Sequence, residues 1–143
     1  MNDQSQNFND ALLDALNAFN RDDYETAYKL FLPLAEQGDM FAQHFLALLH
    51  LEEGVNQDYK EAVKLFLLSA EQGNMFAQYG LGYMYYEGKG VLQDYVSAHM
   101  LWNISGSNGN KGAMNNRNIV EKKMTPQQIE KAQEMVRNWK PKK

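Results

Sequence analysis

The chain has 143 residues, of which 44% are hydrophobic and 12% aromatic, so it can bury a core of about one domain. It contains no cysteine, which excludes disulfides, thiolate nucleophiles and zinc sites of the cysteine type. Residues 1–110 carry 15 acidic and 5 basic side chains (net −10), whereas residues 111–143 carry 3 acidic and 9 basic ones (net +6), so an acidic body precedes a basic terminal segment.

The start of the chain, MNDQSQNFND, lacks the basic and apolar regions of a signal peptide, and no apolar run approaches the roughly 20 residues that cross a bilayer. We therefore expect no membrane partner. The expected location is cytoplasmic if Met1 is the native start and periplasmic if a signal peptide was removed. The basic tail with Lys140, Lys142 and Lys143 comes without a nucleic-acid-binding motif, so no nucleic-acid partner is expected.

The first predicted element is a helix at about Asn9–Asn20, in an opening segment of residues 1–22. Beyond it the chain repeats itself, since AEQGDMFAQ at residues 35–43 returns as AEQGNMFAQ at residues 70–78. Longer copies of the surrounding pattern start at Asp23, Asp58 and Asp94. A fixed period of this length is typical of helical repeat arrays. It divides the middle of the chain into units of residues 23–57, 58–93 and 94–123.

Each unit predicts two helices. An aspartate can cap the first helix of each unit, namely Asp22 or Asp23 in the first unit, Asp58 in the second and Asp94 in the third. Apolar residues then recur every three or four positions. Gly38, Gly73 and Gly109 are expected to end this helix, because glycine adopts a left-handed closing conformation at little cost. The second helix is expected to start at Met40 in the first unit and at Met75 in the second. The sequence thus predicts about eight helices and no strand.

Residues 124–143 predict a capping helix followed by the basic tail. Thr125 can cap this helix, Pro126 fits its first turn, and Gln128 completes a capping box. The apolar side chains of the following turns share one face, which we expect to cover the end of the core. They are Ile129, Ala132, Val136 and Trp139. We therefore interpret Trp139 as a lid on the core and not as part of a ligand site.

The middle unit carries the pattern Ala-x-x-x-Leu-Gly-x-x-Tyr-x-x-Gly-x-Gly-Val-x-x-Asp-Tyr, which resembles the SEL-one-like repeat family, relatives of the tetratricopeptide solenoids. Its residues are Ala77, Leu81, Gly82, Tyr85, Gly88, Gly90, Val91, Asp94 and Tyr95. The ending, Asn116-Arg117 and then MTPQQIEKAQ, is similar to the terminal segment of many bacterial members. The resemblance spans about residues 23–139. It implies an all-α fold, a right-handed α-α superhelical solenoid of about three helix-pair repeats with a C-terminal capping helix, which binds other proteins.

The sequence predicts no catalytic residue, no cofactor and no metal. His44, His50 and His99 are the only histidines, and none lies in a metalloprotease motif or beside a carboxylate at ligand spacing. The glycine-rich segments EGKGV and SGSNGNKG lack the preceding strand and the lysine-serine ending of a phosphate loop. Some relatives of the family have been linked to hydrolysis. A β-lactamase-like hydrolase is therefore kept as an alternative, although no nucleophile and base are paired in the sequence.

A row of uncharged side chains on the second helices is the first candidate binding site. Counting 100° per residue, these side chains lie opposite the core positions. They are Tyr79, Tyr83 and Tyr86 in the middle unit, and His44, Leu48 and Leu51 in the first. Because tyrosine concentrates at interfaces, we hypothesise that these rows line a concave groove for a peptide or a partner helix. In the alternative, the rows pack against the next repeat, and extensive burial of all three tyrosines would favour that alternative.

Two repeated pairs, Met40-Phe41 and Met75-Phe76, form the second candidate site. They are either staples that pack back on the preceding helix or an exposed edge patch that binds a partner or a second copy of the chain. The expected state is a monomer or a weak homodimer. The predicted function is a non-catalytic adaptor that binds a protein or peptide. The alternative within binding is an inhibitor or immunity-type protein that meets a basic partner enzyme with its acidic face.

Overall fold

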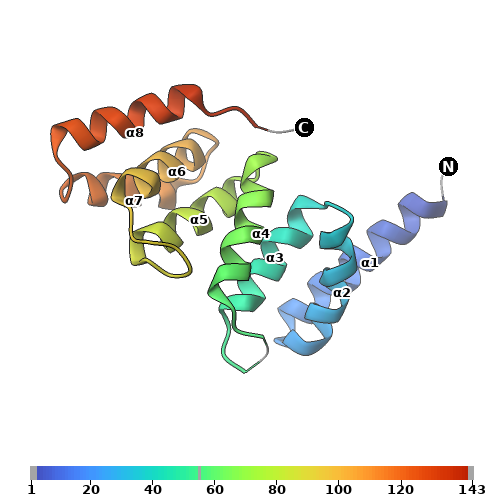
Figure 1. The fold of residues 1–143 in the computed structure, drawn as a ribbon. Coiled ribbons are helices and arrows are strands. Elements are labelled where there is room, and N and C mark those ends of the chain that lie inside the picture. Colours follow the sequence, from blue (N-terminus) through green and yellow to red (C-terminus); the bar gives the residue numbers. More distant parts are fainter. Residues whose placement is uncertain (1–2, 55, 142–143) are drawn as a thin grey trace.

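The computed structural model describes residues 3–54 and 56–141, which form eight α-helices and no strand (Figure 1). The helices are α1 (Asp3–Asn20), α2 (Tyr24–Glu36), α3 (Met40–Leu51), α4 (Tyr59–Glu71), α5 (Met75–Glu87), α6 (Tyr95–Ser107), α7 (Lys111–Glu121) and α8 (Pro126–Asn138). The opening helix begins at Asp3, earlier than the expected Asn9, because the polar residues before the first apolar position continue the helix. The predictions that concern Met1, Lys142 and Lys143 lie outside the described residues.

Aspartate and asparagine side chains start the helices of the repeats. Asp23, Asp58 and Asp94 each accept a hydrogen bond from a backbone N–H of the first turn of α2, α4 and α6. Helices α3 and α5 are capped in the same way by Asp39 and Asn74, each of which follows the glycine that ends the preceding helix. Such caps satisfy backbone donors that a helix start leaves free. The positions predicted as caps therefore act as caps.

Three glycines end the even-numbered helices. Gly38, Gly73 and Gly109 have φ angles of 97°, 101° and 112°, a region that residues with a Cβ rarely adopt. Each allows the chain to turn at once into the cap of the next helix. The repeated AEQG segment is therefore the corner between α2 and α3 and again between α4 and α5.

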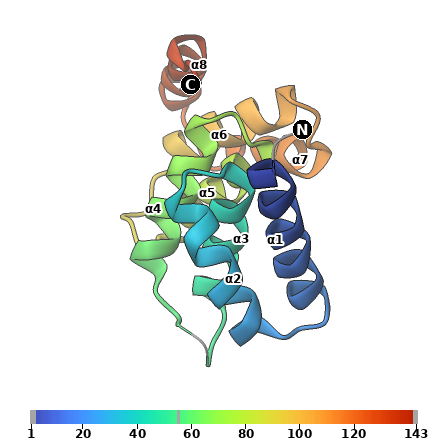
Figure 2. The same ribbon diagram turned by 90° about the vertical axis from the view of Figure 1, so that its right-hand side faces the viewer.

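The helices form a right-handed α-solenoid with two layers. In Figure 2, α1 and α7 lie toward the right of the view, α4 and α8 lie toward the left, and α2 is seen between α1 and α4. The main core lies between consecutive helices and includes the fully buried rings of Phe31 and Phe66. A Cβ added at Gly80 of α5 would lie 2.6 Å from the ring of Phe66, so this glycine permits the close approach of α5 to α4.

Two buried serines connect successive repeats through equivalent hydrogen bonds. Ser69 of α4 donates from Oγ to the carbonyl oxygen of Met40 at 2.7 Å, and Ser105 of α6 donates to that of Met75 at the same distance. Both hydroxyls are fully buried. Each bond ties the last turn of an even-numbered helix to the first residue of the odd-numbered helix before it.

The closing helix α8 packs against α6. It opens with the predicted capping box, in which Thr125 and Gln128 exchange hydrogen bonds between side chain and backbone. Ala132 is fully buried, and Val136 and Trp139 are half-buried against the main core.

Candidate protein-binding surface

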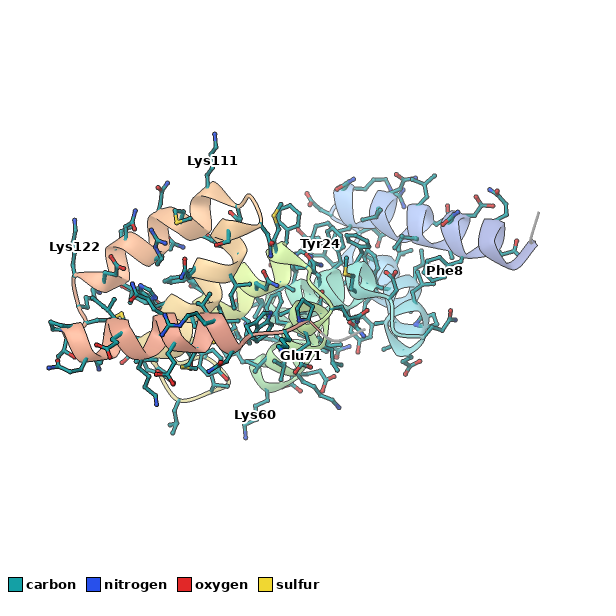
Figure 3. All side chains as sticks on the ribbon, turned by 90° about the horizontal axis from the view of Figure 1, so that it is seen from above. Phe8, Tyr24, Lys60, Glu71, Lys111 and Lys122 are labelled. Carbon is teal, nitrogen blue, oxygen red and sulfur yellow. The ribbon has the colours of Figure 1, made fainter. Side chains whose placement is uncertain are left out.

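Exposed apolar side chains gather on three odd-numbered helices. Phe41 of α3 is 45% exposed, Phe76, Tyr79 and Tyr83 of α5 are 52%, 37% and 39% exposed, and Ile119 of α7 is 51% exposed. We call the surface that these five residues form the aromatic face. In Figure 3, Lys111 at the start of α7 and Lys122, which follows its last residue, point away from the molecule on one side, and Lys60 of α4 points away on the opposite side. Ile119 shares its face of α7 with these two lysines, because positions eight and eleven after Lys111 fall on the same side of a helix.

The aromatic face is continuous from α3 to α7. The ring of Phe76 lies 6.2 Å from the ring of His44, which follows Phe41 by one turn on α3. Tyr79 accepts a hydrogen bond at its hydroxyl from the side chain of Asn116 of α7 at 3.3 Å. The tyrosine row and the two phenylalanines, which the sequence separates into two candidate sites, therefore belong to one surface.

The part of the surface on α3 and α5 is also poor in charge. Helix α3 contains no Asp, Glu, Lys or Arg, and α5 contains only Glu87 in its last position. An exposed helix face that avoids charge and carries aromatic rings is unusual for a face that meets only water. This arrangement can bind an apolar surface of another molecule.

The predicted tyrosines differ in their surroundings. Tyr79 and Tyr83 are more than one-third exposed, whereas Tyr86 is half-buried with its ring 5.5 Å from the rings of Tyr95 and Trp102. The row is therefore partly packed against α6 and partly open. Extensive burial of all three tyrosines, which would favour packing against the next repeat, is not observed.

The equivalent row of α3 is less open. Leu48 and Leu51 are half-buried against the main core, and His44 is enclosed by the rings of Phe45, Phe66 and Phe76. Burial lowers the pKa of His44 to about 4, because the charged imidazolium loses water there without gaining a carboxylate partner. At neutral pH His44 is therefore uncharged where it contacts Phe76 of the aromatic face.

The two methionines that precede the phenylalanines face differently from them. Met40 and Met75 are half-buried, whereas Phe41 and Phe76 are the more exposed members of each pair. The carbonyl oxygens of both methionines accept the serine hydrogen bonds between repeats. The methionines thus belong to the connection between repeats, and the phenylalanines belong to the surface.

A pocket of about 230 Å³ opens on the aromatic face between α5 and α7. It is lined by Tyr83, Tyr86, Trp102, Asn116 and Ile119. Trp102 is 3% exposed, and its indole nitrogen donates a hydrogen bond to the carbonyl oxygen of Tyr79 at 3.1 Å. The sequence did not point to Trp102, because its role depends on Gly82 of the neighbouring helix. A Cβ at Gly82 would lie 2.6 Å from the indole nitrogen.

A lysine donates a hydrogen bond to the hydroxyl of each of the two tyrosines that line the pocket. Lys89 donates to the hydroxyl of Tyr83 at 3.4 Å, and Lys123 donates to that of Tyr86 at 2.6 Å. These hydrogen bonds raise the pKa of both lysines, so both are charged at neutral pH. Their nitrogens also lie 5.3 Å and 5.0 Å from the centres of the same rings, within the range of cation–π attraction. The sequence did not point to these lysines, because a loop and a helix end bring them to the pocket.

The fold brings one histidine beside a carboxylate that lies 22 residues away in the sequence. His99 of α6 lies with Nε2 2.8 Å from a carboxylate oxygen of Glu121 at the end of α7. The pair is a structural contact between two helices, and His99 is almost fully buried. Within residues 3–54 and 56–141, no three His, Asp or Glu side chains gather as a metal site would need. In the same part of the chain, no helix combines the length and the apolar character needed to cross a membrane.

Comparison with known proteins identifies the family. The profile of the Sel1 repeat matches residues 20–39, 41–74 and 76–110, which is more than half of the chain. The chain therefore belongs to the Sel1 repeat family. Proteins of this family are typically protein-interaction modules, and their fold is generally a non-catalytic scaffold. A comparison with curated proteins gives no match.

Two solved structures resemble the chain. One is c5321, described as a protective antigen present in uropathogenic Escherichia coli strains and displaying an SLR fold. It has 32% identity and a TM-score of 0.83 over 87% of this chain. The other is a Sel1 repeat protein from Oxalobacter formigenes, with 30% identity and a TM-score of 0.62 over 66% of this chain. The chain spans only 28% of the length of the first and 40% of the second.

Proposed function

We propose that this chain is a non-catalytic interaction module that binds a segment of a partner protein on its aromatic face. The observation that carries the proposal is the continuous row of exposed rings on α3 and α5, two helices whose only charged side chain is Glu87. Aromatic rings provide large contact areas, and the hydroxyls of Tyr79 and Tyr83 can still form hydrogen bonds at the rim. Membership of the Sel1 repeat family supports a protein as the partner.

The test is affinity capture from a lysate of the native host, with a matched pair of variants. The first variant carries Phe76→Ser and Tyr83→Ser on the aromatic face. The second carries Leu67→Ser and Leu68→Ser on α4, where the two leucines are 40% and 42% exposed, comparable with the residues of the first variant. Circular dichroism must show the same helix content for both variants and the wild type.

A protein captured by the wild type and by the α4 variant, and lost with the aromatic-face variant, is the expected result. Loss with the α4 variant alone would place the interaction on the even-numbered helices and contradict the proposal. Exchange into higher salt separates the second binding alternative, because an acidic surface that meets a basic enzyme loses affinity as salt screens the charges. Binding through the aromatic rings keeps the contribution of apolar contact at high salt, because salt does not screen it.

The same face could also bind a second copy of the chain, so we propose a monomer or a weak homodimer and test it directly. A Phe41→Ala, Phe76→Ala variant and the wild type are compared by solution mass over a range of protein concentrations. A mass that rises with concentration in the wild type alone would assign the face to self-association. A monomer in both samples leaves it free for another protein. The cytoplasmic location expected from the sequence stays a proposal, which fractionation of native cells would check.

A further inference from the structure

The pocket between α5 and α7 has an apolar interior. Two lysines outside its lining, Lys89 and Lys123, bind the hydroxyls of its two tyrosines, and we call them the rim lysines. Its walls are two tyrosines and Ile119, and its floor is the indole of Trp102. The nitrogens of Lys89 and Lys123 are fixed on the hydroxyls of these same tyrosines. The tyrosines that line the pocket therefore also determine where the two lysine charges lie.

The rim lysines are not neutralised by ion pairs. Glu87 lies near enough to both for a long-range attraction, but among the described residues no carboxylate forms an ion pair within 4.0 Å of either nitrogen. Lys122 and Lys111 add two more exposed cations along the outer side of α7, on the face that Ile119 shares (Figure 3). Glu121, the one carboxylate of α7, is engaged by His99. The α7 side of the aromatic face is thus basic, whereas the chain before residue 111 is acidic.

We propose that this pocket selects an acidic peptide segment of the partner, with one apolar side chain in the pocket and neighbouring carboxylates on Lys89 and Lys123. The apolar side chain would displace water from the indole and tyrosine rings. The burial of apolar surface would provide the favourable free energy of binding. The carboxylates would replace the hydration of two lysines whose nitrogens are held on the hydroxyls of the pocket tyrosines, and charge complementarity of this kind gives specificity. This inference rests on the proposed function and specifies the chemistry of the partner segment.

The first experiment selects peptides from a random 12-residue display library on the purified chain. The expected consensus has one apolar residue with aspartate or glutamate beside it. A consensus that is neutral or basic around the apolar residue would overturn the inference and leave the proposed function standing, provided that the Phe76→Ser, Tyr83→Ser variant loses the selected peptides. Failure to select any peptide would also overturn the inference, and the capture experiment would then decide the proposed function by itself.

The second experiment locates one selected acidic peptide, made synthetically, on the protein. The chain has two tryptophans, so a ¹⁵N-labelled sample gives two indole N–H resonances. We expect the resonance of Trp102 to shift on titration and that of Trp139, which lies at the end of α8 and does not line the pocket, to stay in place. A shift of Trp139 alone, or of neither, would contradict the assignment.

A charge-matched pair of variants tests the lysines. Lys89→Gln with Lys123→Gln is expected to weaken binding of the acidic peptide by about tenfold or more, which corresponds to two exposed charge contacts. The control, Lys60→Gln with Lys131→Gln, removes the same number of charges from α4 and α8 and should leave the affinity within about twofold. Equal losses in both variants would show that only the net charge of the protein matters and would overturn the inference.

Discussion

Gly82 illustrates how a single missing side chain shapes the candidate site. The indole of Trp102 occupies the space next to its Cα, and from there it forms the floor of the pocket and binds the carbonyl oxygen of Tyr79. In this chain, packing against Trp102 explains why the Leu-Gly pair of the family motif needs its glycine. The glycine of the motif lets a tryptophan of the next helix lie beneath the tyrosines.

Replacing Gly82 with alanine should displace the indole and lower the free energy of unfolding by about 1–3 kcal/mol, as overpacking of a full core does. Gly112 of α7 provides the control, because a Cβ there would meet its nearest neighbours at 3.4 Å and 3.7 Å. Gly112→Ala should leave stability unchanged or raise it by up to about 1 kcal/mol, since alanine favours the helix. Urea unfolding of both variants measures the difference. Equal stability of Gly82→Ala and the wild type would show that the indole can move without cost.

Burial of His44 should make the free energy of unfolding depend on pH. Because burial lowers its pKa to about 4, only the unfolded chain binds a proton at His44 as the pH falls below the ordinary value of about 6.5. Above that value both states are neutral and the residue contributes nothing. Between about pH 7.5 and about pH 5 the free energy of unfolding should fall by about 2 kcal/mol through this residue.

The measurement compares urea unfolding of the wild type and a His44→Gln variant at the two pH values. Other groups contribute to the pH dependence of both proteins, so the informative quantity is the difference between the two changes. The variant should lose about 2 kcal/mol less than the wild type on acidification. The same loss in both proteins would contradict the assignment of a low pKa to His44.

At the scale of single elements, the connection between repeats rests on a few buried polar bonds. The hydroxyls of Ser69 and Ser105 hold the carbonyl oxygens that begin α3 and α5. Each serine belongs to one even-numbered helix and each acceptor to the odd-numbered helix before it. The two bonds therefore hold the second helix of one repeat against the first helix of the next repeat.

Ser69→Ala and Ser105→Ala should each lower the free energy of unfolding by about 1–2 kcal/mol, because each removes a buried hydrogen bond between two helices. Ser69→Ala also removes the hydroxyl that accepts a hydrogen bond from Asn74 at 3.0 Å. The double variant should lose about the sum, since distant sites contribute independently. Ser107, which is exposed at the end of α6, offers the matched control, and Ser107→Ala should have almost no effect. Thermal or urea unfolding of the four variants and the wild type checks these expectations. If Ser105→Ala had the same free energy of unfolding as the wild type, water would be able to replace the serine hydroxyl.

The elements were largely predictable from the sequence, and the site was only partly so. Caps such as Asp58, closing glycines such as Gly73 and the box at Thr125 act over a few residues, so the local sequence determines them. The family motif then supplied the handedness of the array. The pocket depends on contacts between residues far apart, such as Lys123 with Tyr86, and no local pattern encodes those. Periodicity could show which residues face away from the core, but it could not show that Tyr86 is half-buried while Tyr83 stays open.

At the scale of the whole molecule, a solenoid has no single centre. Each helix packs mainly against its neighbours along the array, so stability is close to a sum of repeat and interface terms. Inner helices have neighbours on both sides, whereas α1 and α8 lie at the ends of the array (Figure 1). Local opening is therefore expected to start at the ends.

Hydrogen exchange followed by mass spectrometry should show this gradient. Amides of α4, α5 and α6 should exchange most slowly, and those of α1 should exchange faster by about an order of magnitude or more. The Thr125→Ala variant should speed exchange in α8 and leave α4 unchanged, because the loss of a cap acts on its own helix. Uniform exchange rates along the chain would instead indicate that the array opens as one cooperative unit.

The duplicated corner between the helices also bears on how the gene can change. Joining Gly38 directly to Asn74 would create the junction AEQGNMFAQ, which is already present at residues 70–78. Recombination between the two copies can therefore remove or add a complete repeat without creating a sequence that is foreign to the fold. Every such event would shorten or lengthen the aromatic face by one helix. The length of the partner segment that the face can bind would thus change by the width of one helix at each event. The chemistry of the pocket, at the other end of the array, would not change with it.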